Sequence, residues 1–235
     1  MGVKTEWVTV RLGMEQYQAY LAAPEQGSHP GIVVYQEIFG VNEHIRAVAE
    51  RLASEGYACL APDLFWRQRP GYQTGYSPED IEEGRKIRGQ LDLQRLTDDL
   101  RASLQTLRNR PECGGKKVGT IGFCFGGLVS YLSAARLDPA CAVCYYGGGI
   151  ANHLAEFQSI GAPILFHFGA QDASIPMEQV EQIKEAASKS KIDWELHVYP
   201  EAGHGFNCDL RASFHPASAK EAWTRTLAFF QRHLS

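Results

Sequence analysis

The sequence predicts an α/β fold in one domain over residues 1–235, with a mostly parallel sheet covered by helices on both faces. Strand-like and helix-like segments take turns along most of the chain. Several of the strand-like segments are continuous apolar runs, as expected of strands buried on both faces. A chain of 235 residues can bury a large core without a second domain.

The chain is expected to begin with an antiparallel hairpin. Its two segments, Trp7–Arg11 and Tyr17–Leu21, alternate polar and apolar residues on either side of a turn at Gly13. A buried strand at Gly31–Tyr35 and another at Tyr57–Ala61 follow. The helix expected between these two strands ends at Gly56 and carries one apolar face, formed by Ile45, Val48, Ala49 and Leu52.

The second half of the chain continues the alternation. Leucines at steps of three and four predict a long amphipathic helix from Leu93 to Leu107. Strands are expected at Lys117–Ile121, Cys141–Tyr146, Pro163–Phe168 and Trp194–Tyr199, and the last helix buries a face between Ala222 and Phe230.

The segment Leu64–Gln90 is the irregular part, too polar and broken to form core. It follows a strand end, where ligand sites of parallel sheets lie, so we expect a pocket wall or lid. A solvated surface loop and helix is the alternative.

Composition excludes several classes of function. The chain is 44% hydrophobic and 21% charged, with a net charge of −4 and no basic block, so we expect no nucleic-acid partner. No apolar stretch approaches a membrane span, and Met1–Glu6 contains no apolar signal core. We therefore expect a cytoplasmic enzyme that does not bind membranes.

The cysteines are spread along the chain, which favours reduced thiols over a disulfide framework. Cys141 and Cys144 stand three apart on a predicted strand, so they point to opposite faces and do not form a redox or zinc pair. No clustered His, Asp or Glu spacing indicates a metal, and we expect no cofactor. The six thiols are Cys59, Cys113, Cys124, Cys141, Cys144 and Cys208.

The strongest indication of a catalytic site is a glycine-rich turn at Gly122–Gly127 (GFCFGG). It lies between a predicted strand and a predicted helix, with glycines two residues before and after Cys124. That arrangement is the nucleophile elbow of α/β-hydrolases, here with Cys in place of Ser. The alternative is a buried structural cysteine beside a packing turn.

A thiol nucleophile needs a base, and the base needs a carboxylate that orients it. The α/β-hydrolase order is nucleophile, acid, histidine. His204 follows the strand Trp194–Tyr199 and is flanked by glycines, and Asp172 follows the preceding strand. Asp172 could instead cap the helix that begins at Pro176. The predicted triad is Cys124, His204 and Asp172.

The strand Gly31–Tyr35 leads into a loop where the second oxyanion donor of such folds lies. The backbone N–H groups of Ile38 and Phe125 are the expected pair of donors. From spacing alone, Glu37 in the same loop is read as an exposed carboxylate.

Together these motifs resemble the dienelactone hydrolase (carboxymethylenebutenolidase) family along nearly the whole chain. The matching segments are Gln36–Asn42, Ala61–Leu64, Gly122–Gly127, Gly169–Asp172 and Ala202–Phe206. The resemblance implies an α/β-hydrolase fold and opening of a small enol-lactone to a dicarboxylic acid in aromatic degradation. It assigns Cys124 as nucleophile, His204 as base and Asp172 as orienter, and it gives Glu37 the role of taking the thiol proton when substrate binds.

The family grips the lactone carboxylate with two arginines, and this chain departs from that pattern. Cys208 and Ile81 stand at the corresponding positions. Nearby cations could replace them, or could be solvated or ion-paired. The expected substrate contacts are Arg85, Arg88, Arg211, Trp66 and Phe206.

The sequence therefore predicts a hydrolase of a small lactone or ester that works through a Cys124 acyl-enzyme. A general carboxylesterase with no carboxylate requirement is the alternative. A more remote alternative is a non-enzymatic thiol sensor or binding protein with the same fold.

Overall fold

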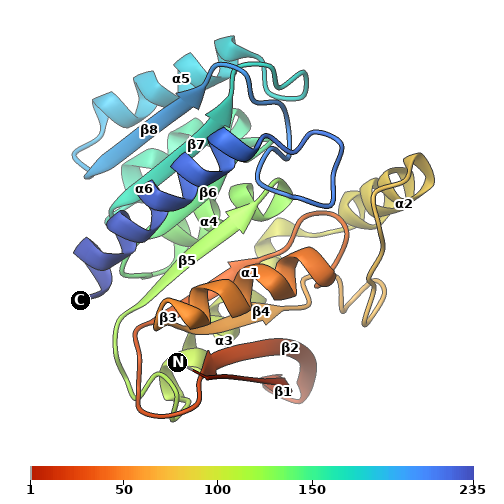
Figure 1. The fold of residues 1–235 in the computed structure, drawn as a ribbon, viewed down its shortest axis with the longest axis vertical. Helices are drawn as coiled ribbons and strands as arrows, with labels where there is room; N and C mark the ends of the chain where they lie inside the picture. The colour runs from red at the N-terminus through yellow and green to blue at the C-terminus, as the bar shows by residue number, and fades with distance from the viewer. Residues whose placement is uncertain (1) are drawn as a thin grey trace.

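A computed structural model describes residues 2–235 of the chain. They form one eight-stranded sheet in the order β1-β2-β4-β3-β5-β6-β7-β8, flanked by helices (Figure 1). This is the architecture predicted from the alternating pattern. The strands are β1 (Val3–Leu12), β2 (Glu15–Pro24), β3 (Gly31–Tyr35), β4 (Ala58–Pro62), β5 (Val118–Phe123), β6 (Ala142–Tyr145), β7 (Ile164–Gly169) and β8 (Trp194–Tyr199).

The predicted N-terminal hairpin is present. Strands β1 and β2 pair antiparallel around a turn in which Gly13 has a φ of 60°, a conformation that glycine adopts without steric cost. Strand β2 then pairs antiparallel with β4, and from β4 to β8 neighbouring strands run parallel. The hairpin thus extends a parallel sheet at one edge.

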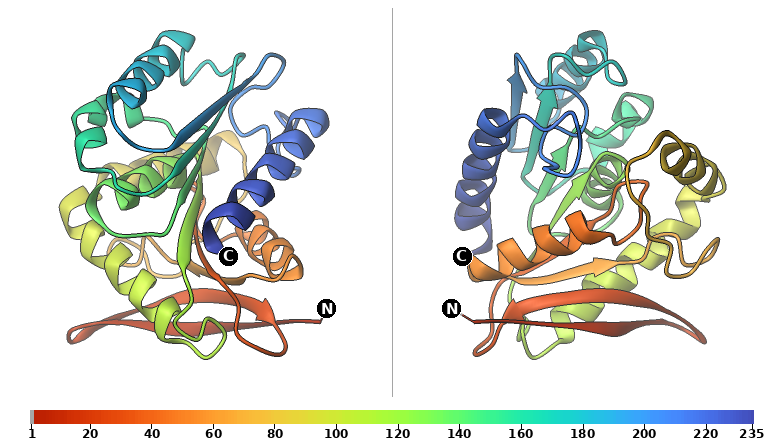
Figure 2. Two further views of the ribbon diagram at one scale, coloured as in Figure 1. Left: turned by 90° about the vertical axis from the view of Figure 1, so that its left-hand side faces the viewer. Right: turned by 45° about the vertical axis from the view of Figure 1, so that its right-hand side comes forward.

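Helices cover both faces of the sheet. Helices α1 and α6 lie on one side, and α3, α4 and α5 lie on the other (Figure 2, left). None of the helices in residues 2–235 combines the length and apolar character that crossing a bilayer requires. The helices are α1 (Glu43–Ser54), α2 (Pro78–Gly89), α3 (Leu93–Asn109), α4 (Phe125–Arg136), α5 (Met177–Lys189) and α6 (Pro216–Leu234), with a short 3₁₀ segment, η1 (Ile150–Ser159).

The central strands are buried along their whole length, which explains their continuous apolar runs. Every residue of β3, β4, β5, β6 and β7 is buried, whereas β8 at the sheet edge is mostly half-buried. The core therefore forms on both faces of the sheet and holds the carboxyl ends of its strands in place.

The irregular segment contributes more to the core than the sequence indicated. Leu64 and Phe65 are buried, so the prediction that this segment is too polar for core is wrong for its first residues. Helix α2 follows, started by a capping box between Ser77 and Asp80. At Gly84 this helix comes so close to the loop after β3 that a Cβ would lie 2.4 Å from the Ile38 carbonyl oxygen.

Candidate active site

Cys124 occupies a strained turn between β5 and α4. Its φ of 55° and ψ of −113° lie outside the regions that L-residues ordinarily adopt. The flanking glycines permit the turn: a Cβ on Gly122 would lie 1.8 Å from the Gly126 carbonyl oxygen, and one on Gly126 would lie 2.2 Å from the Tyr35 carbonyl oxygen. The turn leaves the thiol half-buried rather than in the core.

His204 and Asp172 are joined across two loops. His204 Nδ1 lies 2.7 Å from Asp172 Oδ2, and the two residues follow β8 and β7 respectively. This contact fixes the orientation of the imidazole and leaves Nε2 as its other functional nitrogen. Cys124 and His204 line the same cavity, so all three members of the predicted triad meet at the carboxyl ends of the strands.

Asp172 is held by the backbone of its own loop. Its Oδ1 accepts hydrogen bonds from the N–H groups of Ser174 (2.8 Å) and Ile175 (3.2 Å). The N-cap position of α5 is Pro176, with no side-chain cap, so Asp172 does not cap that helix. One carboxylate oxygen therefore anchors the side chain and the other faces His204.

The electrostatic surroundings of His204 favour its protonated form. Burial lowers the pKa of the ring, but the Cys124 sulfur and the Asp172 carboxylate outweigh it and raise the pKa of His204 to about 10. An imidazolium is therefore stabilised whenever the nearby thiol has lost its proton.

Tyr146 is a site residue that the sequence reasoning missed. Its ring meets the His204 ring edge-on at 5.2 Å between centroids, and its backbone φ is 36°. Burial raises the pKa of Tyr146, and its hydroxyl has no hydrogen-bond partner within residues 2–235. The available signal was the glycine run directly after it, Gly147–Gly149, at the end of β6.

The backbone N–H groups of Ile38 and Phe125 are free of hydrogen bonds to other groups of residues 2–235. Phe125 is the first residue of α4, where an N–H has no intrahelical partner. Ile38 and Phe125 both line the cavity that holds Cys124. Both groups can therefore donate to a bound oxygen.

The cavity over Cys124 has a volume of about 380 Å³. Arg85 and Arg88 of α2 line it together with Arg211, and no acidic residue of the described chain is among its lining residues. Arg85 and Arg88 form no salt bridge with a carboxylate in residues 2–235. The cavity therefore presents positive charge, while Ile38, Phe39, Ile81 and Phe125 supply its apolar wall.

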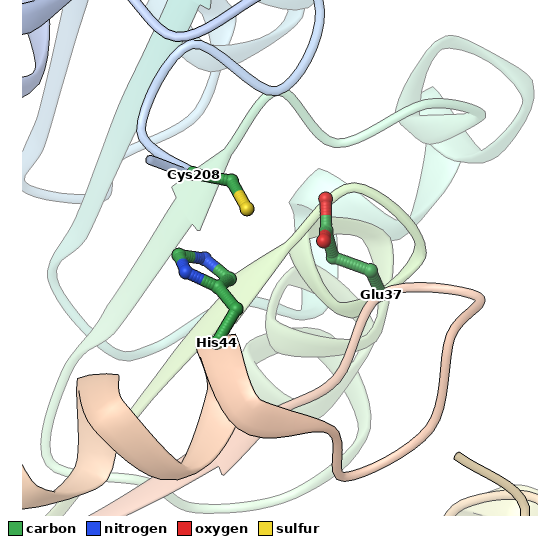
Figure 3. Close-up of side chains that lie close together, drawn as sticks. All are labelled: Glu37, His44 and Cys208. Carbon is green, nitrogen blue, oxygen red and sulfur yellow. The ribbon is translucent and has the colours of Figure 1, made fainter. Parts of the chain in front are cut away.

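Glu37 is fully buried, which overturns the spacing-based interpretation of it as an exposed loop carboxylate. Its Oε1 accepts a hydrogen bond from Arg211 Nη1 at 3.0 Å, and its Oε2 has no partner within residues 2–235. His44 from α1 and Cys208 from the loop before α6 converge on the same carboxylate (Figure 3). Arg211 thus connects the cavity with a buried charged cluster.

Trp66 and Phe206, which we expected to contact substrate, do not line this cavity. Trp66 stacks on Tyr17 at 5.2 Å between ring centroids and donates its indole N–H to Asp99, so its side chain is held against α3. Phe206 is fully buried and packs against Tyr146 at 5.3 Å between centroids. Phe206 therefore contacts the Tyr146 ring, which in turn packs against His204.

Comparison with known proteins identifies the family. The family model described as "Dienelactone hydrolase family" matches residues 17–234. The chain belongs to the dienelactone hydrolase family. It is 35% identical to a carboxymethylenebutenolidase of Pseudomonas putida over 216 residues, which cover 91% of this chain and 90% of that protein. It is 39% identical to a candidate carboxymethylenebutenolidase of Synechocystis sp. over 99% of this chain and 98% of that one.

A solved structure agrees with this assignment. The crystal structure of a candidate dienelactone hydrolase from Klebsiella pneumoniae superposes with a TM-score of 0.89 at 33% identity, covering 99% of this chain and 100% of that one. Membership in the family confirms two expectations from the sequence, the α/β-hydrolase fold and a hydrolase that acts on esters or lactones.

The role of the Asp172 carboxylate can be tested with an isosteric amide. In Asp172→Asn the side-chain oxygen can still accept from Ser174 and Ile175, but an amide no longer stabilises the imidazolium. We expect kcat for ester hydrolysis to fall by about 10²- to 10⁴-fold, with the melting temperature nearly unchanged.

Asp63 provides the matched control, because it is a buried carboxylate after β4 that also accepts two backbone N–H groups, from Phe65 and Gly71. Asp63→Asn should affect only stability. Normal specific activity in folded Asp172→Asn would show that Asp172 is structural.

Proposed function

We propose that this protein hydrolyses a small lactone or ester that carries a carboxylate, through an acyl-enzyme on Cys124. The observation that carries the proposal is the 2.7 Å contact between His204 Nδ1 and Asp172 Oδ2 beside the strained elbow of Cys124. Nucleophile, base and orienter in this arrangement are the parts that acyl transfer requires.

In the proposed reaction the Cys124 thiolate attacks the carbonyl carbon, and the ester oxygen leaves. His204, which carries a proton at the start of the cycle, donates it to that oxygen and then removes one from the water that attacks the thioester. The Cys124 thiolate that is released takes back the proton it gave up before its attack. The N–H groups of Ile38 and Phe125 stabilise the oxyanion, and one such donor is typically worth about 2.7–4 kcal/mol. In a lactone the leaving oxygen stays attached to the acyl group, so deacylation yields a hydroxy or oxo acid.

Glu37 is proposed as the acceptor of the Cys124 proton when substrate binds, as the family resemblance implies. Its ion pair with Arg211 supports a physical reason for this timing. A substrate carboxylate in the cavity competes for the Arg211 guanidinium and weakens its hold on Glu37. The freed carboxylate is then the stronger base.

Preference for an anionic substrate rests on Arg85, Arg88 and Arg211 at the cavity. The apolar wall of the same cavity favours the second candidate function, a general carboxylesterase that accepts neutral esters.

A substrate panel separates the two functions. Neutral p-nitrophenyl esters are set beside lactones and esters that carry a carboxylate, with Cys124→Ala as the inactive reference. In Arg88→Gln we expect KM to rise roughly 10- to 100-fold for the carboxylated substrates only, since a hydrogen bond to a charged group is worth about 1.5–3 kcal/mol. Lys86→Gln is the control, a cation of the same helix that pairs with Glu82. An equal effect of Arg88→Gln on neutral esters would favour the general carboxylesterase.

The proposed role of Glu37 predicts how free enzyme reacts with alkylating agents. If the thiol keeps its proton until substrate binds, the iodoacetamide rate should be low near pH 6 and rise as the pH is raised, because the thiolate is the reactive form. In Glu37→Gln, turnover should be lost, because an amide cannot accept the proton, while the fold is kept.

Glu112→Gln is the matched control, because Glu112 is also buried and paired with an arginine but lies outside the cavity. A fast, pH-independent alkylation at pH 6 would indicate a permanent thiolate–imidazolium pair and refute the role of Glu37.

A further inference from the structure

The cluster beside the active site has the composition of a metal-binding site. One ring nitrogen of His44, the Cys208 sulfur and a carboxylate oxygen of Glu37 all lie within 4.8 Å of one another (Figure 3). Glu37 and His44 are close in the sequence, but Cys208 is far from both, so no spacing pattern predicts the cluster. Imidazole, thiolate and carboxylate are the ligand types that Zn²⁺ takes in proteins.

Two of these groups have polar atoms that the protein leaves unsatisfied. Glu37 Oε2 and His44 Nε2 are buried and have no hydrogen-bond partner within residues 2–235. A buried polar atom without a partner is destabilising, so a ligand that accepts both lone pairs relieves that cost. A cation is such a ligand, because carboxylate oxygens and neutral imidazole nitrogens both donate electron pairs.

The position of His44 suits a metal ligand. The ring is buried, and its Nε2 has no hydrogen-bond partner within residues 2–235. His44 Nδ1 lies 4.0 Å from the exposed carboxylate of Asp209. A proton on Nδ1 faces that negative charge, which favours the tautomer with a free lone pair on Nε2.

Cys208 has a partner that suits both states of its sulfur. The thiol now donates to the Tyr76 hydroxyl at 3.2 Å, and Asn42 Nδ2 donates to the same hydroxyl. Once the thiol is deprotonated, Tyr76 can reverse the hydrogen bond and donate to the sulfur.

We infer that Glu37, His44 and Cys208 form a binding site for a thiophilic divalent cation of the Zn²⁺ class. Binding releases the Cys208 proton to solvent and forms bonds from the metal to sulfur, nitrogen and Glu37 Oε2, while Arg211 keeps Oε1. Neighbouring ligands of tetrahedral zinc stand about 3.4 Å apart, given metal–ligand distances of 2.0–2.3 Å. The three ligand atoms now lie within 4.8 Å of one another, and side-chain rotations bring them to that spacing.

The site has a consequence that rests on the proposed function. A metal bound to Glu37 Oε2 withdraws this carboxylate from proton transfer, so Zn²⁺ inhibits hydrolysis without touching Cys124. The cation is therefore an inhibitor of this enzyme and not its catalyst.

Binding is measured without turnover, in the full-length Cys124→Ala protein, where the catalytic thiol cannot contribute. Titration with Zn²⁺ should give one site per chain, and Co²⁺ used as a spectroscopic probe should show a thiolate-to-metal charge-transfer band. Adding Cys208→Ser or His44→Leu should lower the affinity by at least about tenfold, and the serine should abolish the band.

Cys59→Ala in the same background is the matched control, because Cys59 is a buried thiol of β4 outside the cluster. Melting curves confirm that each variant is folded. Equal Zn²⁺ affinity with and without Cys208 would refute the site and indicate adventitious binding elsewhere.

The inhibition is then tested on protein with an intact Cys124. Zn²⁺ should lower ester hydrolysis reversibly with a chelator, and Cys208→Ser should resist it at the same concentration. Equal inhibition of Cys208→Ser would assign the effect to the Cys124–His204 pair and refute the inhibitory mechanism. Binding at the cluster without inhibition would support the metal site and refute the role of Glu37.

Discussion

The close approach of backbone segments around Cys124 is the constraint on which the rest of the site depends. A residue held at a φ of 55° is strained, and the strain persists only because strand β5 and helix α4 are both packed in the core. In return the thiol stands at the carboxyl ends of the strands, where the loops after β3, β7 and β8 bring their side chains to it. Glycine at Gly122 and Gly126 is therefore a requirement of the fold and of the site together.

Charge is arranged around the thiol in two layers. Asp172 and His204 form the first layer, next to the thiol, with Tyr146 packed against the imidazole. Glu37 and Arg211 form a second, buried layer, in which Arg211 also lines the cavity. An anion that enters the cavity can therefore affect the buried Glu37 carboxylate through its ion pair with Arg211. The proposed effects of substrate charge and of metal binding both act on Glu37.

The sequence predicted those features that depend on backbone pattern. Buried strands, the glycine elbow and the positions of Asp172 and His204 follow from apolar runs, turn residues and chain order, and the structure brings them together. The sequence did not predict the features that depend on the direction in which a side chain points. Glu37 is buried, and Trp66 faces α3 rather than the cavity, and neither direction is set by residues nearby in sequence. The cluster of His44 and Cys208 was missed for the same reason, since it exists only once the loop before α6 lies against α1.

The central claim is that Cys124 carries the acyl group during turnover. The most direct measurement mixes the enzyme with p-nitrophenyl acetate, quenches in acid within the first turnovers, and maps the modified peptide by mass spectrometry. We expect an acetyl group on the peptide that contains Cys124, appearing with a burst of nitrophenol and absent from Cys124→Ala. Acetylation of a different residue, or undiminished turnover by Cys124→Ala, would contradict it.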